Sequence, residues 1–234
     1  MTWKQAFTSS IGKKLVMGLT GVFLISFLLV HVGLNACIWA NDNGEMFNKG
    51  AHFMGNTVVV RIMEIGLFAG IILHIVQGYM LTASNNSKRK VGYAQDYGNK
   101  GSKWYSRSMG LLGTLILLFL IMHVYHFWAP SRLGGVAGVK ELEAVEYGTG
   151  FHTHNLYLEM LNVFQDPLVV IVYVIGVISL CYHLLHGFHS AFRTLGVHNK
   201  RYAKMLRNFG YGYAIIVCLA FAMMPVSMYL GWVK

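Results

Sequence analysis

Five long apolar stretches leave this chain few ways to fold. They cover residues 15–39, 57–83, 109–129, 167–190 and 210–232. About 20 apolar residues in a helix are enough to cross the hydrocarbon core of a bilayer. Backbone polar groups have no water to bind there, so each such segment forms a helix with internal hydrogen bonds. The sequence therefore predicts an all-α membrane protein, a five-helix bundle in which residues 1–234 form a single membrane domain.

The composition agrees with this prediction. Hydrophobic residues make up 55% of the 234 residues and charged residues only 12%, which is far from an ordinary soluble domain. The formal net charge of +10 is also found in nucleic-acid-binding proteins, but those present a basic soluble surface. Here the basic residues lie in short loops between apolar stretches, so we expect no nucleic-acid partner.

The loop charges predict the orientation. Three loops hold 14 of the 19 basic residues: Lys4, Lys13, Lys14, Lys88, Arg89, Lys90, Lys100, Lys103, Arg107, Arg193, Lys200, Arg201, Lys204 and Arg207. The other loops hold seven of the nine acidic residues: Asp42, Glu45, Glu141, Glu143, Glu146, Glu159 and Asp166. Short loops rich in Lys and Arg remain in the cytoplasm. We therefore expect a multi-pass protein with a cytoplasmic N-terminus.

Four histidines, one in each of the first four stretches, are the main candidates for function: His31, His74, His123 and His183. An ionisable side chain inside a membrane is costly and indicates a functional site. Neutral imidazole is a good iron ligand, and facing helices can hold a flat ring between them. The histidines therefore indicate two haems. Since the sequence has no Cys-x-x-Cys-His element, the haems would be noncovalent, b-type haems.

Sequence distance from the cytoplasmic basic residues sorts the histidines into two pairs. His31 and His123 lie 17 and 16 residues into the membrane, or roughly 24 to 26 Å at 1.5 Å per residue. His74 and His183 lie 14 and 10 residues in, or roughly 15 to 21 Å. The counts predict an outer haem between His31 and His123 and an inner haem between His74 and His183.

Other interpretations of these histidines remain open. His126 and His186 each follow a candidate ligand by three residues and share much of its helix face, so both compete as ligands. A transporter with a histidine proton relay is the alternative without haem.

The end of the fourth stretch carries His189, Ser190 and Arg193. Haem propionates bind hydrogen-bond donors and positive charge, so these three are candidate propionate ligands. A solvated helix end at the membrane surface explains them equally well.

Three sequence elements resemble one known family. Residues 182–196, YHLLHGFHSAFRTLG, are similar to its His-x-x-x-Gly element with the loop glycine that follows. His123-Val124-Tyr125 is similar to its His-Leu-Tyr element, and residues 7–21, FTSSIGKKLVMGLTG, are similar to the N-terminal stretch of its Bacteroidetes branch. Over nearly its whole length the chain resembles the two-haem cytochrome b subunit of bacterial succinate dehydrogenases and fumarate reductases, the succinate:quinone oxidoreductases.

The resemblance implies which histidines bind iron. It favours His123 over His126 and His183 over His186, and it pairs the ligands as the depth count does. One residue departs from the family: some members carry a glutamate linked to proton transfer where this chain has Cys181. A proton route through that position is therefore not supported.

The resemblance also implies partners and an activity. A flavoprotein (FAD) subunit and an iron-sulfur subunit would bind on the cytoplasmic side of a bacterial inner membrane and interconvert succinate and fumarate. Electrons would pass between them and a membrane quinone, menaquinone, through the two haems. The complex would be able to form a higher oligomer. The alternative function that also uses haem is that of a cytochrome b subunit of a formate dehydrogenase or hydrogenase.

The second stretch carries Arg61 and Glu64, one helical turn apart, so the two side chains are predicted to pair. The family has an acidic residue near the start of its second helix at an outer quinone site, a position that Glu64 or Glu45 takes here. Glu64 is thus the candidate catalytic residue, for quinone-linked proton exchange. A purely structural ion pair with Arg61 is the alternative.

Overall fold

The computed structural model describes residues 2, 9–87, 103–148, 150–197, 199 and 201–233. Several residues used in the sequence analysis lie outside these ranges: Lys4, Phe7, Thr8, Lys88, Arg89, Lys90, Lys100 and Lys200. The predicted basic loop between the second and third stretches is therefore described only from Lys103 onward.

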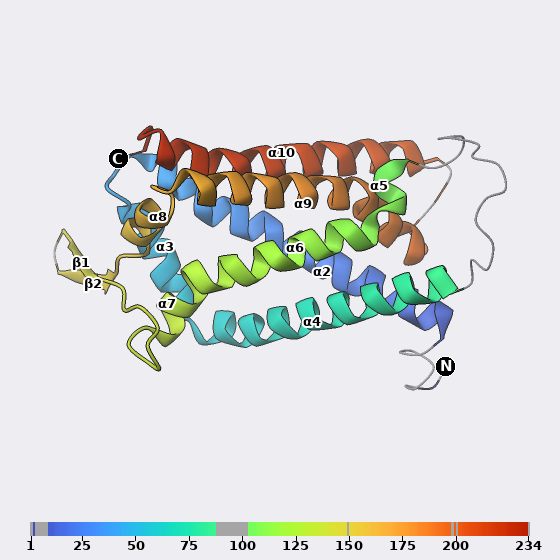
Figure 1. Cartoon of the computed structure of the whole chain (residues 1–234), viewed down its shortest axis with the longest axis horizontal. Coiled ribbons are helices and arrows are strands. Elements are labelled where there is room, and N and C mark those ends of the chain that lie inside the picture. The colour runs from blue at the N-terminus through green and yellow to red at the C-terminus, as the bar shows by residue number, and fades with distance from the viewer. Residues whose placement is uncertain are drawn as a thin grey trace. The chain divides into compact units, whose positions relative to one another are not determined.

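Five long helices follow the five apolar stretches (Figure 1). They are α2 (Ser10–Ala36), α4 (Val58–Ser87), α6 (Met109–His123), α9 (Pro167–Thr194) and α10 (Ala203–Tyr229). A 3-10 helix, η1 (Cys37–Ala40), continues α2; a π-helix, η2 (Val124–Trp128), and then α7 (Ala129–Leu133) continue α6. In the described part of the chain, five helices are long and apolar enough to cross a membrane. The prediction of a multi-pass helical membrane protein is confirmed.

Two helices begin earlier than the apolar stretches. α2 starts at Ser10 and includes Lys13 and Lys14, and α10 starts at Ala203 and includes Lys204. A helix can continue past the hydrocarbon core, because charged side chains at its end reach the hydrated interface. Hydropathy therefore marks the membrane-spanning part of a helix rather than its full length.

The structure adds a small hairpin to the predicted all-α fold. β1 (Ala144–Tyr147) pairs antiparallel with β2 (Phe151–His154), with Ala144 opposite His154 and Tyr147 opposite Phe151. Gly148 and Gly150 between them have φ values of 56° and 90°, which glycine adopts without steric strain. A strand of four residues contains only two repeats of the alternating pattern, which is the shortest stretch that can indicate a strand. The shorter helices are α3 (Glu45–Asn56), α5 (Trp104–Arg107) and α8 (Leu156–Val163).

The chain divides into two compact units. Unit 1 comprises Met1–Phe27, Ile65–Thr114 and Ser179–Ile215, and unit 2 comprises Leu28–Glu64, Leu115–Ile178 and Ile216–Lys234. Each of the five long helices contributes one segment to each unit. The candidate histidines divide in the same way, two to each unit. The single membrane domain stays a prediction.

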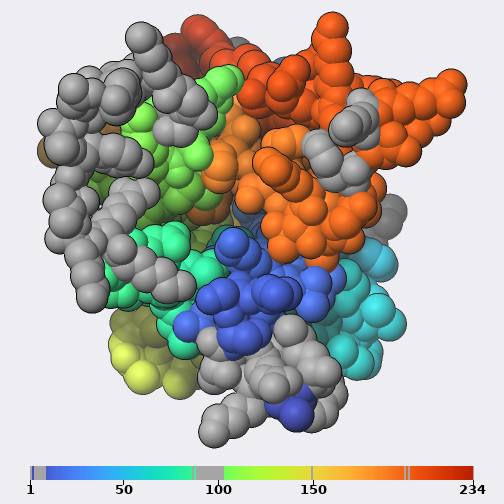
Figure 2. All heavy atoms as spheres, turned by 90° about the vertical axis from the view of Figure 1, so that its right-hand side faces the viewer, coloured from blue at the N-terminus to red at the C-terminus, as the bar shows by residue number. Residues whose placement is uncertain are grey.

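In unit 1, α2, α9 and α10 are joined by close contacts. A Cβ atom on Gly18 of α2 would lie 3.5 Å from the backbone oxygen of Ala191 and 3.5 Å from the Thr194 side chain. Figure 2 shows this start of α2, in blue, beside the end of α9, in orange. The Tyr213 hydroxyl of α10 donates to the backbone oxygen of Ile25 at 2.6 Å.

In unit 2, a fully buried asparagine ties α3 to the hairpin and to α8. Asn48 donates to the Tyr147 hydroxyl at 2.8 Å and to Oδ1 of Asn155 at 2.9 Å, and accepts from the backbone N–H of Tyr157 at 3.0 Å. Buried polar groups stabilise a fold when their hydrogen bonds are made. Unit 2 also contains an apolar core that includes Ile38, Phe47, Tyr157, Met160, Phe164, Tyr173, Met224 and Met228.

Candidate functional site

His31 of α2 and His123 of α6 face each other in unit 2. Their ring centroids are 5.7 Å apart and their planes meet at 88°. Aromatic rings surround the pair: Phe221 lies 5.6 Å from His31, and Phe119 and Phe127 lie 5.6 and 5.4 Å from His123. Nδ1 of His123 is buried and has no hydrogen-bond partner among the described residues.

His74 of α4 and His183 of α9 form a second pair, in unit 1. Their ring centroids are 6.1 Å apart, with an interplanar angle of 64°. The hydroxyl of Thr20 lies 3.0 Å from Nδ1 of His74. A Cβ atom on Gly21 would be 3.7 Å from Cε1 of His74, and one on Gly187 would be 3.9 Å from Cδ2 of His183. The two glycines leave the sides of these rings free of larger side chains.

The separation within each pair fits two imidazoles on opposite sides of one metal ion. A metal–imidazole nitrogen bond is about 2.0–2.1 Å long. Two such bonds, together with the distance from each bound nitrogen to the centre of its ring, place the two ring centroids roughly 6 Å apart. Each ring can rotate about its own metal–nitrogen bond, so both interplanar angles are compatible with axial ligation. Paired imidazoles on facing helices are a donor set that suits haem iron. The residues present therefore fit one bis-histidine haem in each unit, while their role as ligands stays a prediction.

The structure separates His126 from the neighbouring candidate ligand. Nδ1 of His126 lies 3.0 Å from the Tyr173 hydroxyl, and the two rings stack with planes 8° apart. Because η2 begins directly after His123 and a π-helix has more residues per turn than an α-helix, three residues turn His126 further from the face of His123. The sequence count assumed a regular α-helix. In α9, the ring that faces His74 belongs to His183, one turn before His186.

The predicted propionate ligands lie near the end of α9, in unit 1. His189 and Ser190 are half-buried and Arg193 is exposed in the last turn. The Ser190 backbone oxygen accepts a hydrogen bond from the Thr194 hydroxyl at 2.8 Å. Their role toward a propionate stays a prediction.

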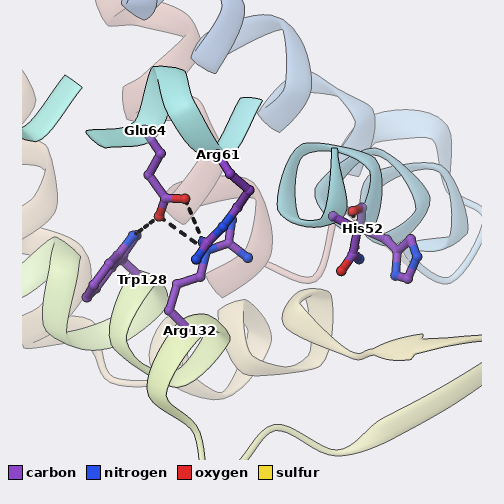
Figure 3. A network of polar contacts seen from close by, with 6 residues as sticks. His52, Arg61, Glu64, Trp128 and Arg132 are labelled. Atoms are coloured by element: carbon purple, nitrogen blue, oxygen red, sulfur yellow. Dashed lines mark hydrogen bonds and ion pairs between the residues drawn. The ribbon is translucent and has the colours of Figure 1, made fainter. Parts of the chain in front are cut away.

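Glu64 belongs to a network within unit 2 (Figure 3). Its Oε2 accepts from Nη1 of Arg61 at 2.7 Å, which confirms the predicted pair. Its Oε1 accepts from Nε of Arg132 at 3.2 Å and from Nε1 of Trp128. In Figure 3 the Glu64 carboxylate points toward Trp128 and Arg132, with His52 further away. The Glu64 side chain is only 15% exposed, and its two carboxylate oxygens accept from three donors.

The structure adds three residues to the site that no sequence pattern predicted: Trp128, Arg132 and Thr20. Trp128 and Arg132 are four residues apart and so share a helix face, which is a weak signal. Gly55 of α3 leaves room for the guanidinium, because a Cβ atom there would lie 2.7 Å from Nη1 of Arg132. Nothing in the sequence indicates that these residues meet Glu64, 64 and 68 positions away.

Lys103, in the predicted cytoplasmic loop before α6, contacts two tyrosines of unit 1. Its Nζ donates to the Tyr211 hydroxyl at 3.0 Å and lies 5.5 Å from the centroid of the Tyr105 ring. Hydrogen bonds with Tyr105 and Tyr211 raise the pKa of Lys103 above its usual value. Lys103 therefore stays positively charged at neutral pH.

The chain is similar in sequence to a succinate dehydrogenase subunit. It shares 24% identity over 179 residues, covering 76% of this chain and 73% of the other, with the succinate dehydrogenase cytochrome b558 subunit of Bacillus subtilis (strain 168). No family model and no solved structure matches the chain. The similarity extends over most of both chains and supports the relationship to succinate dehydrogenase cytochrome b subunits that the sequence motifs indicated.

Proposed function

We propose that this protein is the membrane cytochrome b subunit of a succinate:quinone oxidoreductase. It anchors an FAD-containing flavoprotein and an iron-sulfur subunit and carries electrons between them and membrane quinone. The observation that carries the proposal is the pair of facing imidazoles in each unit, with ring centroids 5.7 and 6.1 Å apart. The similarity to a succinate dehydrogenase cytochrome b558 subunit supports the identity of the complex.

In this proposal His31 and His123 hold one b-type haem, and His74 and His183 hold the other. Bound haem supplies reversible one-electron iron chemistry, whose potential depends on the ligands and their surroundings. The chain contributes two helices to each pair, which hold the imidazoles at a fixed separation. His189, Ser190 and Arg193 would donate hydrogen bonds and positive charge to the propionates at one helix end.

The same proposal places the N-terminus and the basic loops in the cytoplasm of a bacterium, where the two soluble subunits bind. It rests on the 14 basic residues of three loops. Reporter fusions after residues 97 and 200 should read as cytoplasmic, and fusions after residues 45 and 145 as external. The reverse pattern would exclude both the orientation and the proposed docking face.

We propose Glu64 as the group that exchanges protons with the quinone, menaquinone in this assignment. Its side chain is mostly buried, and the carboxylate accepts from three side chains. The three donors hold the carboxylate in place, and a carboxylate is the member of this network whose chemistry includes proton exchange.

Spectroscopy of the purified complex tests the function. We expect two noncovalent low-spin haems per copy of this chain, and copurification with a flavoprotein and an iron-sulfur protein that oxidise succinate. A different soluble partner would indicate a formate dehydrogenase or hydrogenase type. A folded protein without a Soret band would rule out the haem assignment and favour a transporter.

A further inference from the structure

Thr20 lies within hydrogen-bonding distance of one candidate ligand and is almost fully buried. Its side chain is on α2 in unit 1, and its Oγ1 is 3.0 Å from Nδ1 of His74. The same oxygen is 2.8 Å from the backbone carbonyl oxygen of Val16, four residues earlier in the helix, and 3.3 Å from that of Met17. Three acceptors or potential acceptors therefore surround one hydroxyl group.

The direction of the contact between Thr20 and His74 depends on which imidazole nitrogen carries the proton. A threonine hydroxyl carries a single proton, and the carbonyl oxygens of Val16 and Met17 can only accept. The hydroxyl proton can go to one of these carbonyl oxygens, at 2.8 or 3.3 Å, and none is then left for His74. In that arrangement Nδ1 of the imidazole carries a proton and donates it to Oγ1. In neutral His74 the other nitrogen, Nε2, then holds the free lone pair.

We propose that Thr20 is a positioning residue that fixes His74 in the tautomer able to bind iron through Nε2. This inference rests on the proposed haem function. Metal-bound histidines commonly donate their second N–H to a neighbouring acceptor, which fixes the ring orientation and raises the basicity of the ligand. A more basic imidazole stabilises ferric iron over ferrous iron and so lowers the midpoint potential.

The effect is confined to one pair. Nδ1 of His123 and Nδ1 of His183 are buried without a hydrogen-bond partner among the described residues. Nδ1 of His31 lies 3.4 Å from the side-chain nitrogen of Asn35, which is a donor and cannot accept a proton. Thr20 and His74 both belong to unit 1, whereas His31 and His123 belong to unit 2. Removing the Thr20 hydroxyl should therefore change the haem of the His74/His183 pair and leave that of the His31/His123 pair unchanged.

The experiment is a potentiometric titration of both haems in the purified complex, for the parent protein and three variants. Thr20→Val keeps the shape and removes the acceptor, so we expect the midpoint potential of one haem to rise while the other stays constant. Thr20→Ser restores the acceptor and should restore the parent potential. Thr82→Val is the matched control, because the Thr82 hydroxyl also donates to a carbonyl four residues earlier, that of Gly78, within unit 1.

The outcomes separate this inference from the proposed function. Absence of haem from the parent protein would refute the proposed function itself. Two haems in the parent with unchanged potentials in Thr20→Val would refute only the role of Thr20, as would equal shifts in Thr20→Val and Thr82→Val. Loss of one haem in Thr20→Val, with two haems in Thr20→Ser and Thr82→Val, would support it. Loss of both haems in Thr20→Val would show a structural role instead.

Discussion

The two histidine pairs have nearly the same spacing in different surroundings. In unit 2, His31 and His123 lie among the rings of Phe119, Phe127 and Phe221. In unit 1, His74 lies beside Gly21 and the Thr20 hydroxyl instead. The spacing required by a metal with two axial ligands is fixed by bond lengths, whereas the neighbours are free to differ and tune the site. In the proposed function the two haems would therefore have different surroundings and different midpoint potentials.

We expect the strongest effect, the loss of one haem, from variants that remove one histidine of a pair. His123→Ala should remove the haem of unit 2, and His74→Ala the haem of unit 1, because each haem loses one of its two axial ligands. Haem content and reduced-minus-oxidised spectra measure this as a loss of one haem in two. His126→Ala is the control and should retain both haems, because its ring stacks on Tyr173. Normal haem content in His74→Ala would show that the assignment is wrong.

The next strongest effect is expected on quinone-linked turnover, from a change at Glu64 in unit 2. Glu64→Gln keeps the shape of the side chain and removes its charge, so quinone-linked turnover should fall about 100-fold, at the lower end of what a general acid–base group contributes. Both haems and succinate oxidation with an artificial acceptor should be retained. Glu45→Gln is the matched control for the other acidic candidate, which pairs with Lys49 on the surface. Unchanged turnover in Glu64→Gln would leave Glu64 a structural role only.

Loss of the Asn48 hydrogen bonds should destabilise unit 2 more than unit 1. Asn48→Ala removes three hydrogen bonds and leaves the buried N–H of Tyr157 without its acceptor, which should cost about 2–4 kcal/mol. Thermal unfolding followed at each haem should show the His31/His123 haem lost at a lower temperature. The control Asn56→Ala removes an exposed bond within α3 and should change stability by less than about 0.5 kcal/mol. Equal shifts for both haems would show that the units unfold together.

The smallest change in stability is expected in unit 1, from loss of the Tyr213 hydrogen bond. Tyr213→Phe removes the hydrogen bond to the Ile25 backbone oxygen and should cost about 0.5–1.5 kcal/mol. The same thermal experiment should show an earlier loss of the His74/His183 haem. Tyr202→Phe, at an exposed position, serves as the control. A larger effect in Tyr202→Phe than in Tyr213→Phe would contradict the packing described for unit 1.

Local features of the site were predictable and distant ones were not. The Arg61–Glu64 pair follows from a spacing of three residues in a helix, and the structure contains it. Arg132 and Trp128 join the same carboxylate from another helical segment, which no local pattern encodes. The rotation of His126 away from His123 depends on the π-helix η2, and a sequence period of 3.6 residues cannot show such an irregularity.

Local sequence predicts the five membrane-spanning helices and the four histidines inside them, because the energy of placing a residue in a bilayer depends mainly on that residue and its neighbours along the chain. Tertiary packing determines which imidazoles face each other, which hydroxyl lies beside Nδ1 of His74, and which cations surround Glu64. These contacts join segments up to 109 residues apart, and they depend on helix rotation and packing, which apolar composition leaves undetermined.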